Sequence, residues 1–212
     1  MPENQNSASP AMNFAIIIPS KTVSNLVPCV EAIHRHDPGH RLIVVDDGLE
    51  LWSHIVKEGV DIIKGEKPFI FSRNINAGVR RAIELDPGVE GFVLLNDDAL
   101  LESRNGFTVL HEAAKANPEL GCIGAVTQLT GQPLQFPRGI GLRTVPHIAY
   151  VCVYVPRATF EEIQWMDERY CLDYGVDDRD HCEAIVRAGK QVAVHDGCYV
   201  DHGSLVSSFR GN

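Results

Sequence analysis

Apolar residues fall into two kinds of pattern, which alternate along the chain from residue 14 onward. Short continuous apolar runs predict buried strands at residues 14–20, 41–48, 91–99, 121–126 and 148–155. Apolar residues at every third or fourth position predict helices at residues 24–39, 71–88, 107–116 and 157–166. Strands that alternate with amphipathic helices indicate β-α-β units. The pattern therefore predicts an α/β fold in three layers, with a mainly parallel mixed central sheet covered by helices on both faces.

Two later segments follow other patterns. The stretch from Gln132 to Pro146 is rich in Gly and Pro, which predicts a long loop. Beyond residue 176 we expect a further helix, with Cys182, Ile185 and Val186 on its buried face. Gly189 is expected to end that helix.

Composition narrows the class of protein. Of the 212 residues, 44% are hydrophobic and 22% are charged, as in ordinary globular proteins. This length suits a single domain at residues 13–212, after a polar stretch at residues 1–12 that predicts a disordered tail. The net charge of −9 disfavours nucleic acid and anionic membranes as partners. We see neither a signal peptide nor an apolar run long enough to span a membrane, so we expect a cytoplasmic protein.

The cysteine pattern indicates reduced thiols. The chain has six cysteines without a C-x-x-C pair, and several of them lie in apolar runs. Buried free cysteine behaves as a small apolar residue. We therefore expect free thiols rather than disulfides.

Polar residues close three of the predicted strands. They are Ser20, Asp46, Asp47, Asn96, Asp97 and Asp98. Because the carboxyl ends of strands in an open α/β sheet meet where ligands bind, we expect these side chains to converge. Carboxylates beside a buried strand are costly without a counter-charge, and no Lys or Arg is close to Asp97 and Asp98 in sequence. The set suits a nucleotide base and ribose together with a metal ion, and no Gly-rich dinucleotide or P-loop motif is present.

Two further groups near the C-terminus are candidates. Asp177, Asp178 and Asp180 lie at the start of the expected late helix. Capping of the helix explains one or two of these acids, and a general base for an alcohol is the alternative for at least one. His202 is consistent either with ordinary packing or with a metal site, since aspartate and one imidazole nitrogen suit Mn²⁺ or Mg²⁺.

Five sequence segments, in order, resemble the inverting glycosyltransferases of family 2. They are "VVDDG", "SRN" opening a helix, "LLNDD", "MDERYCLDYGVDDRD…RAGK" and "VDHGS". The similarity covers nearly the whole chain after residue 13 and is greatest to the rhamnosyltransferase-like branch. It implies a GT-A, Rossmann-like fold and a transferase that moves a sugar from a UDP- or dTDP-sugar to an acceptor hydroxyl.

The resemblance also implies roles for individual residues. The nucleotide-binding or substrate-binding positions are Ser20, Asp46, Asp47, Arg73, Asn96, Asp97 and Asp177. Asp98 and His202 match the positions that bind Mn²⁺ or Mg²⁺, and Asp178 matches the catalytic base. The acceptor is an unidentified saccharide, lipid-linked sugar or small molecule.

Other interpretations of these residues stay open. Asp46 and Asp47 precede Gly48 and also fit a turn, and Arg73 also fits a surface ion pair. Asp167 and Glu168 fit a structural or an acceptor-binding role.

Departures from the family pattern also bear on the class of protein. The family's Glu-Asp pair is Asp-Asp here, and the acidic motif begins with Asn96. Without a Q-x-x-R-W segment, a processive synthase is not expected. A non-catalytic nucleotide-sugar binding protein is the main alternative. A sugar-phosphate nucleotidyltransferase or a phosphohydrolase fits less well, because the first strand ends at Pro19-Ser20 without their motifs.

Overall fold

The computed structural model describes residues 13–48, 59–67, 69–163, 165–169 and 176–207, and the statements below concern these residues. The tail expected at residues 1–12 lies outside them, as does Cys171.

Nine strands are present within the described ranges. They are β1 (Phe14–Ser20), β2 (Arg41–Asp46), β3 (Val60–Lys64), β4 (Gly91–Leu95), β5 (Leu100–Leu101), β6 (Leu120–Val126), β7 (Leu142–Val145), β8 (Cys152–Pro156) and β9 (Gln191–Asp201). Five α-helices accompany them, with one 3₁₀ turn, η1 (Pro133–Gln135). The helices are α1 (Val23–His36), α2 (Phe71–Leu85), α3 (Gly106–Ala116), α4 (Arg157–Ile163) and α5 (Val176–Arg187).

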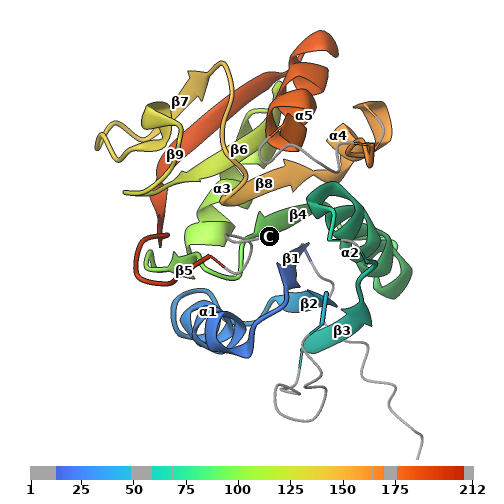
Figure 1. The fold of residues 1–212 in the computed structure, drawn as a ribbon. Helices are drawn as coiled ribbons and strands as arrows, with labels where there is room; N and C mark the ends of the chain where they lie inside the picture. Colours follow the sequence, from blue (N-terminus) through green and yellow to red (C-terminus); the bar gives the residue numbers. More distant parts are fainter. Residues whose placement is uncertain (1–12, 49–58, 68, 164, 170–175, 208–212) are drawn as a thin grey trace, which may run out of the picture.

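The strands form one mixed sheet in the order β3-β2-β1-β4-β8-β6-β9-β5, with β7 paired to β9 (Figure 1). From β3 to β4 every pairing is parallel. β8 runs antiparallel to both of its neighbours, β4 and β6, and β9 then pairs parallel to β6. As a result β1, β4, β6 and β9 all point the same way and end at one edge of the sheet.

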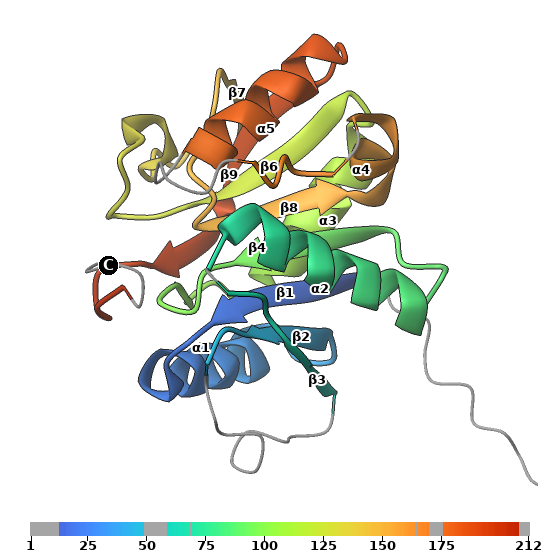
Figure 2. The same ribbon diagram turned by 45° about the vertical axis from the view of Figure 1, so that its right-hand side comes forward.

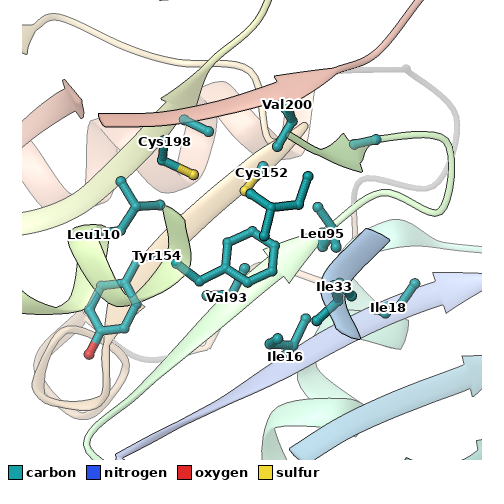
Figure 3. Close-up of a cluster of buried hydrophobic side chains, with 14 of the residues drawn as sticks. Ile16, Ile18, Ile33, Val93, Leu95, Leu110, Cys152, Tyr154, Cys198 and Val200 are labelled. Carbon is teal, nitrogen blue, oxygen red and sulfur yellow. The ribbon is translucent and has the colours of Figure 1, made fainter. Parts of the chain in front are cut away.

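Helices cover both faces of this sheet. On one face, α1 and α3 pack against side chains that include Ile16, Val93 and Tyr154 (Figure 3). On the other face, α2, α4 and α5 pack against a second cluster built around Ile17, Phe92 and Val153. The alternation of side chains along each strand sends neighbouring residues such as Ile16 and Ile17 into opposite layers. The three-layer α/β fold expected from the sequence is confirmed.

Four strands escaped the sequence analysis, and three of its expectations differ from the structure. β3, β5, β7 and β9 were not predicted, and the loop expected from Gln132 to Pro146 contains η1 and β7. β8 begins at Cys152, later than the run at 148–155 suggested. Val186 was expected on the buried face of the late helix and is 52% exposed. β9 is hard to recognise because a bulge beside Asp196 and Gly197 interrupts its pairing with β6.

Two general expectations can be compared with the described residues. Cys29, Cys122, Cys152, Cys182 and Cys198 are free and buried, as predicted. Among the described helices, none has both the length and the apolar character needed to cross a bilayer.

Gly78 lies where α2 packs tightly against β1. A Cβ atom at this position would lie 2.3 Å from Cγ2 of Ile17. We expect Gly78→Ala to lower the free energy of unfolding, because overpacking costs about 1–3 kcal/mol and the gain in helix propensity is at most about 1 kcal/mol. Urea denaturation would measure the change. Gly131→Ala is the control, since nothing lies within 4 Å of its Cβ position; equal stability of the two variants would contradict the expectation.

Candidate functional site

The candidate site lies where the parallel strands end. Figure 2 shows the carboxyl ends of β1 and β9 and the amino ends of α2 and α5 on the same side of the molecule. Helix amino ends carry unsatisfied N–H groups and partial positive charge, which favours anionic groups at this edge. Most of the polar residues proposed from the sequence lie at or directly after these strand ends.

A hydrogen bond between Ser20, the last residue of β1, and Asp97, just after β4, joins the ends of these two strands. The Ser20 hydroxyl donates a hydrogen bond of 2.6 Å to Oδ2 of Asp97, and both residues are fully buried. A buried, ionised carboxylate requires such donors. The contact spans β1 and β4, so the convergence expected from the strand ends is present.

Asp46 is the last residue of β2 and Asp47 follows it, and the two side chains have different environments. Oδ1 of Asp46 accepts the N–H of Gly48 at 2.7 Å, so this side chain stabilises the turn. The backbone N–H of Asp47 donates to the Ser20 carbonyl at 2.9 Å, which fixes Asp47 beside β1. Oδ1 of Asp47 is buried and has no hydrogen-bond partner among the described residues. Burial raises the pKa of Asp47, although the charges of Lys67 and Lys21 oppose the shift.

The Asn96-Asp97-Asp98 motif forms a tight turn after β4. The N–H of Ala99 donates to the Asn96 carbonyl at 3.1 Å, and Asp98 is only 3% exposed. Nε2 of His202 lies 3.3 Å from Oδ1 of Asp98. His202 directly follows β9, so this pair links the end of β4 to the end of β9.

The orientation of the His202 ring suits a metal ligand. Nδ1 of His202 contacts the Leu129 carbonyl at 2.8 Å, and because a carbonyl only accepts, Nδ1 carries a proton. Nε2 therefore faces Asp98, and in the neutral ring its lone pair points towards a carboxylate oxygen. Metal-binding histidines commonly use one nitrogen for the ion and donate the other N–H to a carbonyl. In the described part of the chain, no group of three or more His, Cys, Asp or Glu side chains has metal-binding geometry. A cation here would take its remaining ligands from substrate or water.

Asp177 and Asp178 occupy the first turn of α5. The Asp177 carboxylate accepts the N–H groups of Asp178 and of Ser72, so it caps the start of α2 as well as its own helix. Oδ2 of Asp178 accepts the backbone N–H of Tyr150 at 3.0 Å. Burial, and then the neighbouring charge of Asp177, raise the pKa of Asp178 to about 7, whereas the Tyr150 N–H opposes the shift. Asp178 can therefore exchange a proton near neutral pH.

Arg73 makes ion pairs with surface acids. Its guanidinium lies 3.3 Å from Glu66 and 3.8 Å from Glu168, and 28% of its side chain is exposed. Glu168 also accepts hydrogen bonds from Asn76 at 2.9 Å and Arg80 at 3.3 Å. These contacts match the alternatives for Arg73 as an ion-pair residue and for Glu168 as a structural residue.

Tyr150 was missed by the sequence analysis. Its backbone holds Asp178, and its buried hydroxyl lies 2.5 Å from Nδ1 of His181. The next residue, Val151, accepts the N–H of Asn96 through its carbonyl at 2.9 Å. Backbone contacts of this kind leave no signature in residue type, so no sequence signal pointed to this segment.

The geometry defines an α/β protein with acidic groups gathered at the carboxyl edge of a mixed sheet. No family model matches the chain, and no curated protein matches its sequence. The fold matches that of GT-A glycosyltransferases of known structure.

Two of those structures illustrate the similarity. A crystal structure of GalNAc-T7 with UDP, GalNAc and Mn²⁺ superposes with a TM-score of 0.69 at 12% identity, over 92% of this chain. A structure of S. aureus TarS, residues 1–349, superposes with a TM-score of 0.60 at 14% identity, over 89% of this chain. This chain spans 44% of the GalNAc-T7 chain and 60% of the TarS chain. At these identities the similarity establishes the fold.

Proposed function

We propose that the protein is an inverting glycosyltransferase of family 2 that uses a UDP- or dTDP-sugar and a divalent cation. The observation that carries the proposal is the pairing of Asp98 with His202 at the carboxyl edge of a GT-A fold. The GalNAc-T7 structure, which shares this fold, contains UDP and Mn²⁺. The family and its rhamnosyltransferase-like branch rest on the order of the sequence motifs.

The nucleoside would bind between the ends of β1 and β2. Oδ1 of Asp47 is a buried acceptor in need of a donor, and the N3–H of uracil or thymine supplies one. Ser20 orients Asp97 through their hydrogen bond, and Asn96 and Asp97 would face the ribose. Arg73 would contact the nucleotide only after exchanging its partners Glu66 and Glu168.

Asp98 and His202 would hold Mn²⁺ or Mg²⁺. Their donor set, one carboxylate oxygen and one imidazole nitrogen whose ring is fixed by the Leu129 carbonyl, fits such an ion. When bound, the ion would neutralise the charge that develops on the departing nucleoside diphosphate.

Asp178 would act as the general base. Its carboxylate would accept the proton of the acceptor hydroxyl as that oxygen attacks the anomeric carbon, on the face opposite the leaving diphosphate. A single displacement of this kind inverts the configuration. The N–H of Tyr150 fixes the direction in which the Asp178 carboxylate points, and Asp177 anchors the start of α5 to α2.

Turnover is expected to increase with pH through a value of about 7, the pKa of Asp178. Because the base must be ionised, the rate falls as the pH drops below this value and levels off above it. Measurement of kcat under saturating donor and cation between about pH 5 and 9 checks the expectation. An acidic limb near the ordinary carboxylate pKa of about 4 would contradict the proposed environment of the base.

Calorimetric titration with UDP and dTDP, each with Mn²⁺ and with EDTA, tests the proposed site. Cation-dependent binding of either nucleotide supports the proposal, and the absence of binding in both conditions rejects it. A non-catalytic nucleotide-sugar binding protein is distinguished by donor hydrolysis in the presence of Mn²⁺, which only an enzyme produces. The anomeric configuration of a transferred sugar, read by NMR, decides between inversion and retention.

A further inference from the structure

A short irregular segment, residues 148–151, connects the two halves of the candidate site. At one end, the Val151 carbonyl accepts the N–H of Asn96 at 2.9 Å, which ties the segment to the motif after β4. One residue earlier, the N–H of Tyr150 donates to Asp178 at 3.0 Å, which ties it to α5. We call residues 148–151 the bridging segment.

The bridging segment is itself anchored from a third direction. Oε1 of the buried residue Gln135 accepts the N–H of Ala149 at 2.7 Å, and its Nε2 donates to the Ala149 carbonyl at 3.1 Å. The side chains of Ile148, Tyr150 and Val151 are at most 5% exposed. The segment thus has hydrogen bonds to η1, to α5 and to the turn after β4, and it has little freedom to move.

Tyr150 contacts α5 at two points. Its N–H holds Asp178, and its hydroxyl lies 2.5 Å from Nδ1 of His181, three residues further along the same helix. Residues three apart lie on one face of a helix, so both contacts fix the same surface of α5. Phe160 also packs against the His181 ring, with centroids 5.5 Å apart.

Neither the Tyr150 hydroxyl nor the His181 ring changes its protonation state near neutral pH. Burial lowers the pKa of His181 to about 4, so the ring is neutral, and burial raises the pKa of Tyr150, so the hydroxyl is protonated. Nε2 of His181 is buried without a hydrogen-bond partner among the described residues, a cost the fold tolerates at this position.

We propose that Tyr150 and His181 are positioning residues, which hold the Asp178 carboxylate at a fixed place relative to the Asn96-Asp97-Asp98 motif. Loss of the hydroxyl–imidazole bond leaves the backbone N–H of Tyr150 in place and removes one of the two contacts through which Tyr150 is fixed against α5. Misplacement of a catalytic group by about 1 Å can cost about 100-fold in rate. The inference rests on the proposed function, because it assigns Asp178 as the base.

Tyr150→Phe tests the proposal, with Tyr154→Phe as the matched control. Tyr154 is also a buried tyrosine bonded to a histidine, with its hydroxyl 2.8 Å from Nδ1 of His111. We expect Tyr150→Phe to lower kcat about 10-fold or more with the KM for donor within about twofold, and Tyr154→Phe to leave both unchanged. Similar losses of thermal stability in the two variants would show that the difference in kcat is not a folding effect.

The pH profile supplies a readout that a purely structural role would not change. The groups that face Asp178 are Asp177 and Cys182 on α5 and Tyr150 in the bridging segment. Tyr150→Phe keeps the backbone N–H of this residue, but a shifted bridging segment would lengthen its bond to Asp178. Because that bond holds the pKa of Asp178 down, we expect the acidic limb of kcat to move to higher pH in Tyr150→Phe. His181→Leu should reproduce both effects, and His181→Asn, which keeps a polar atom near the Nδ1 position, should restore most of kcat.

The outcomes separate this inference from the proposed function. Wild-type kcat and an unmoved acidic limb in both Tyr150→Phe and His181→Leu, alongside an inactive Asp178→Asn, would reject the positioning role alone. An active Asp178→Asn would reject Asp178 as the base and the positioning role with it. If Tyr150→Phe fails to fold, the comparison of His181→Leu with His181→Asn decides the question.

Discussion

Replacement of Asp178 by asparagine is expected to reduce sugar transfer about 10²- to 10⁴-fold, the usual contribution of a general base. Asparagine has nearly the same shape and still accepts the N–H of Tyr150, but it cannot take up the proton of the acceptor. Donor affinity should therefore be unchanged. Steady-state kinetics give the loss of kcat, and calorimetry with UDP and Mn²⁺ gives the affinity.

Glu183→Gln is the matched control for this substitution. It also removes one carboxylate from α5, but Glu183 pairs with Arg179 on the exposed side of the helix. Such exposed pairs contribute at most about 1 kcal/mol to stability, so the control should retain wild-type kcat. Equal turnover of Asp178→Asn and Glu183→Gln would exclude Asp178 as the base.

Replacement of Asp98 by alanine is expected to abolish cation-dependent nucleotide binding. Loss of a supporting residue around a metal typically costs 10- to 100-fold in affinity, so loss of the carboxylate ligand should cost at least about 100-fold. Calorimetric titration of Mn²⁺ in the presence of UDP measures this directly and does not depend on turnover. His202→Ala should weaken binding in the same direction, because it removes the other half of the pair.

The control for Asp98→Ala is Glu102→Gln. Glu102 lies four residues later and is exposed, so its loss changes the net charge equally and leaves the candidate site intact. Unchanged Mn²⁺ and UDP affinity in Asp98→Ala would exclude Asp98 and His202 as the cation-binding pair. A parallel loss in both variants would instead indicate a long-range charge effect, which added salt would reduce.

The strand-end residues were predictable from the sequence because their position depends only on the order and direction of the strands. Apolar runs identified β1, β2 and β4, and parallel strands deliver their terminal side chains to one edge. The hydrogen bond from Ser20 to Asp97 is the direct result. The pairing of Asp98 with His202 followed from the motif order, since nothing in the local sequence of His202 distinguishes it from a packed histidine.

Other features depend on contacts that residue types do not encode. Tyr150 holds Asp178 through its backbone, and Asp177 accepts an N–H from the start of α2, which a capping rule applied to α5 alone does not anticipate. Asp196 and Gly197 lie in the bulge of β9, which the sequence analysis did not anticipate. There Asp196 accepts N–H groups from Arg138, Ile140 and Gly141.

The position of β9 at the far end of the described chain has a consequence for the order in which the molecule is completed. The adjacent strands β1, β2, β3 and β4 and helices α1 and α2 all precede β9 in the sequence, so every element of the proposed nucleoside-binding half is synthesised before β9. His202 reaches Asp98 only when β9 has paired with β6. The residues of the proposed nucleoside site are thus synthesised before His202, the second of the two proposed cation ligands.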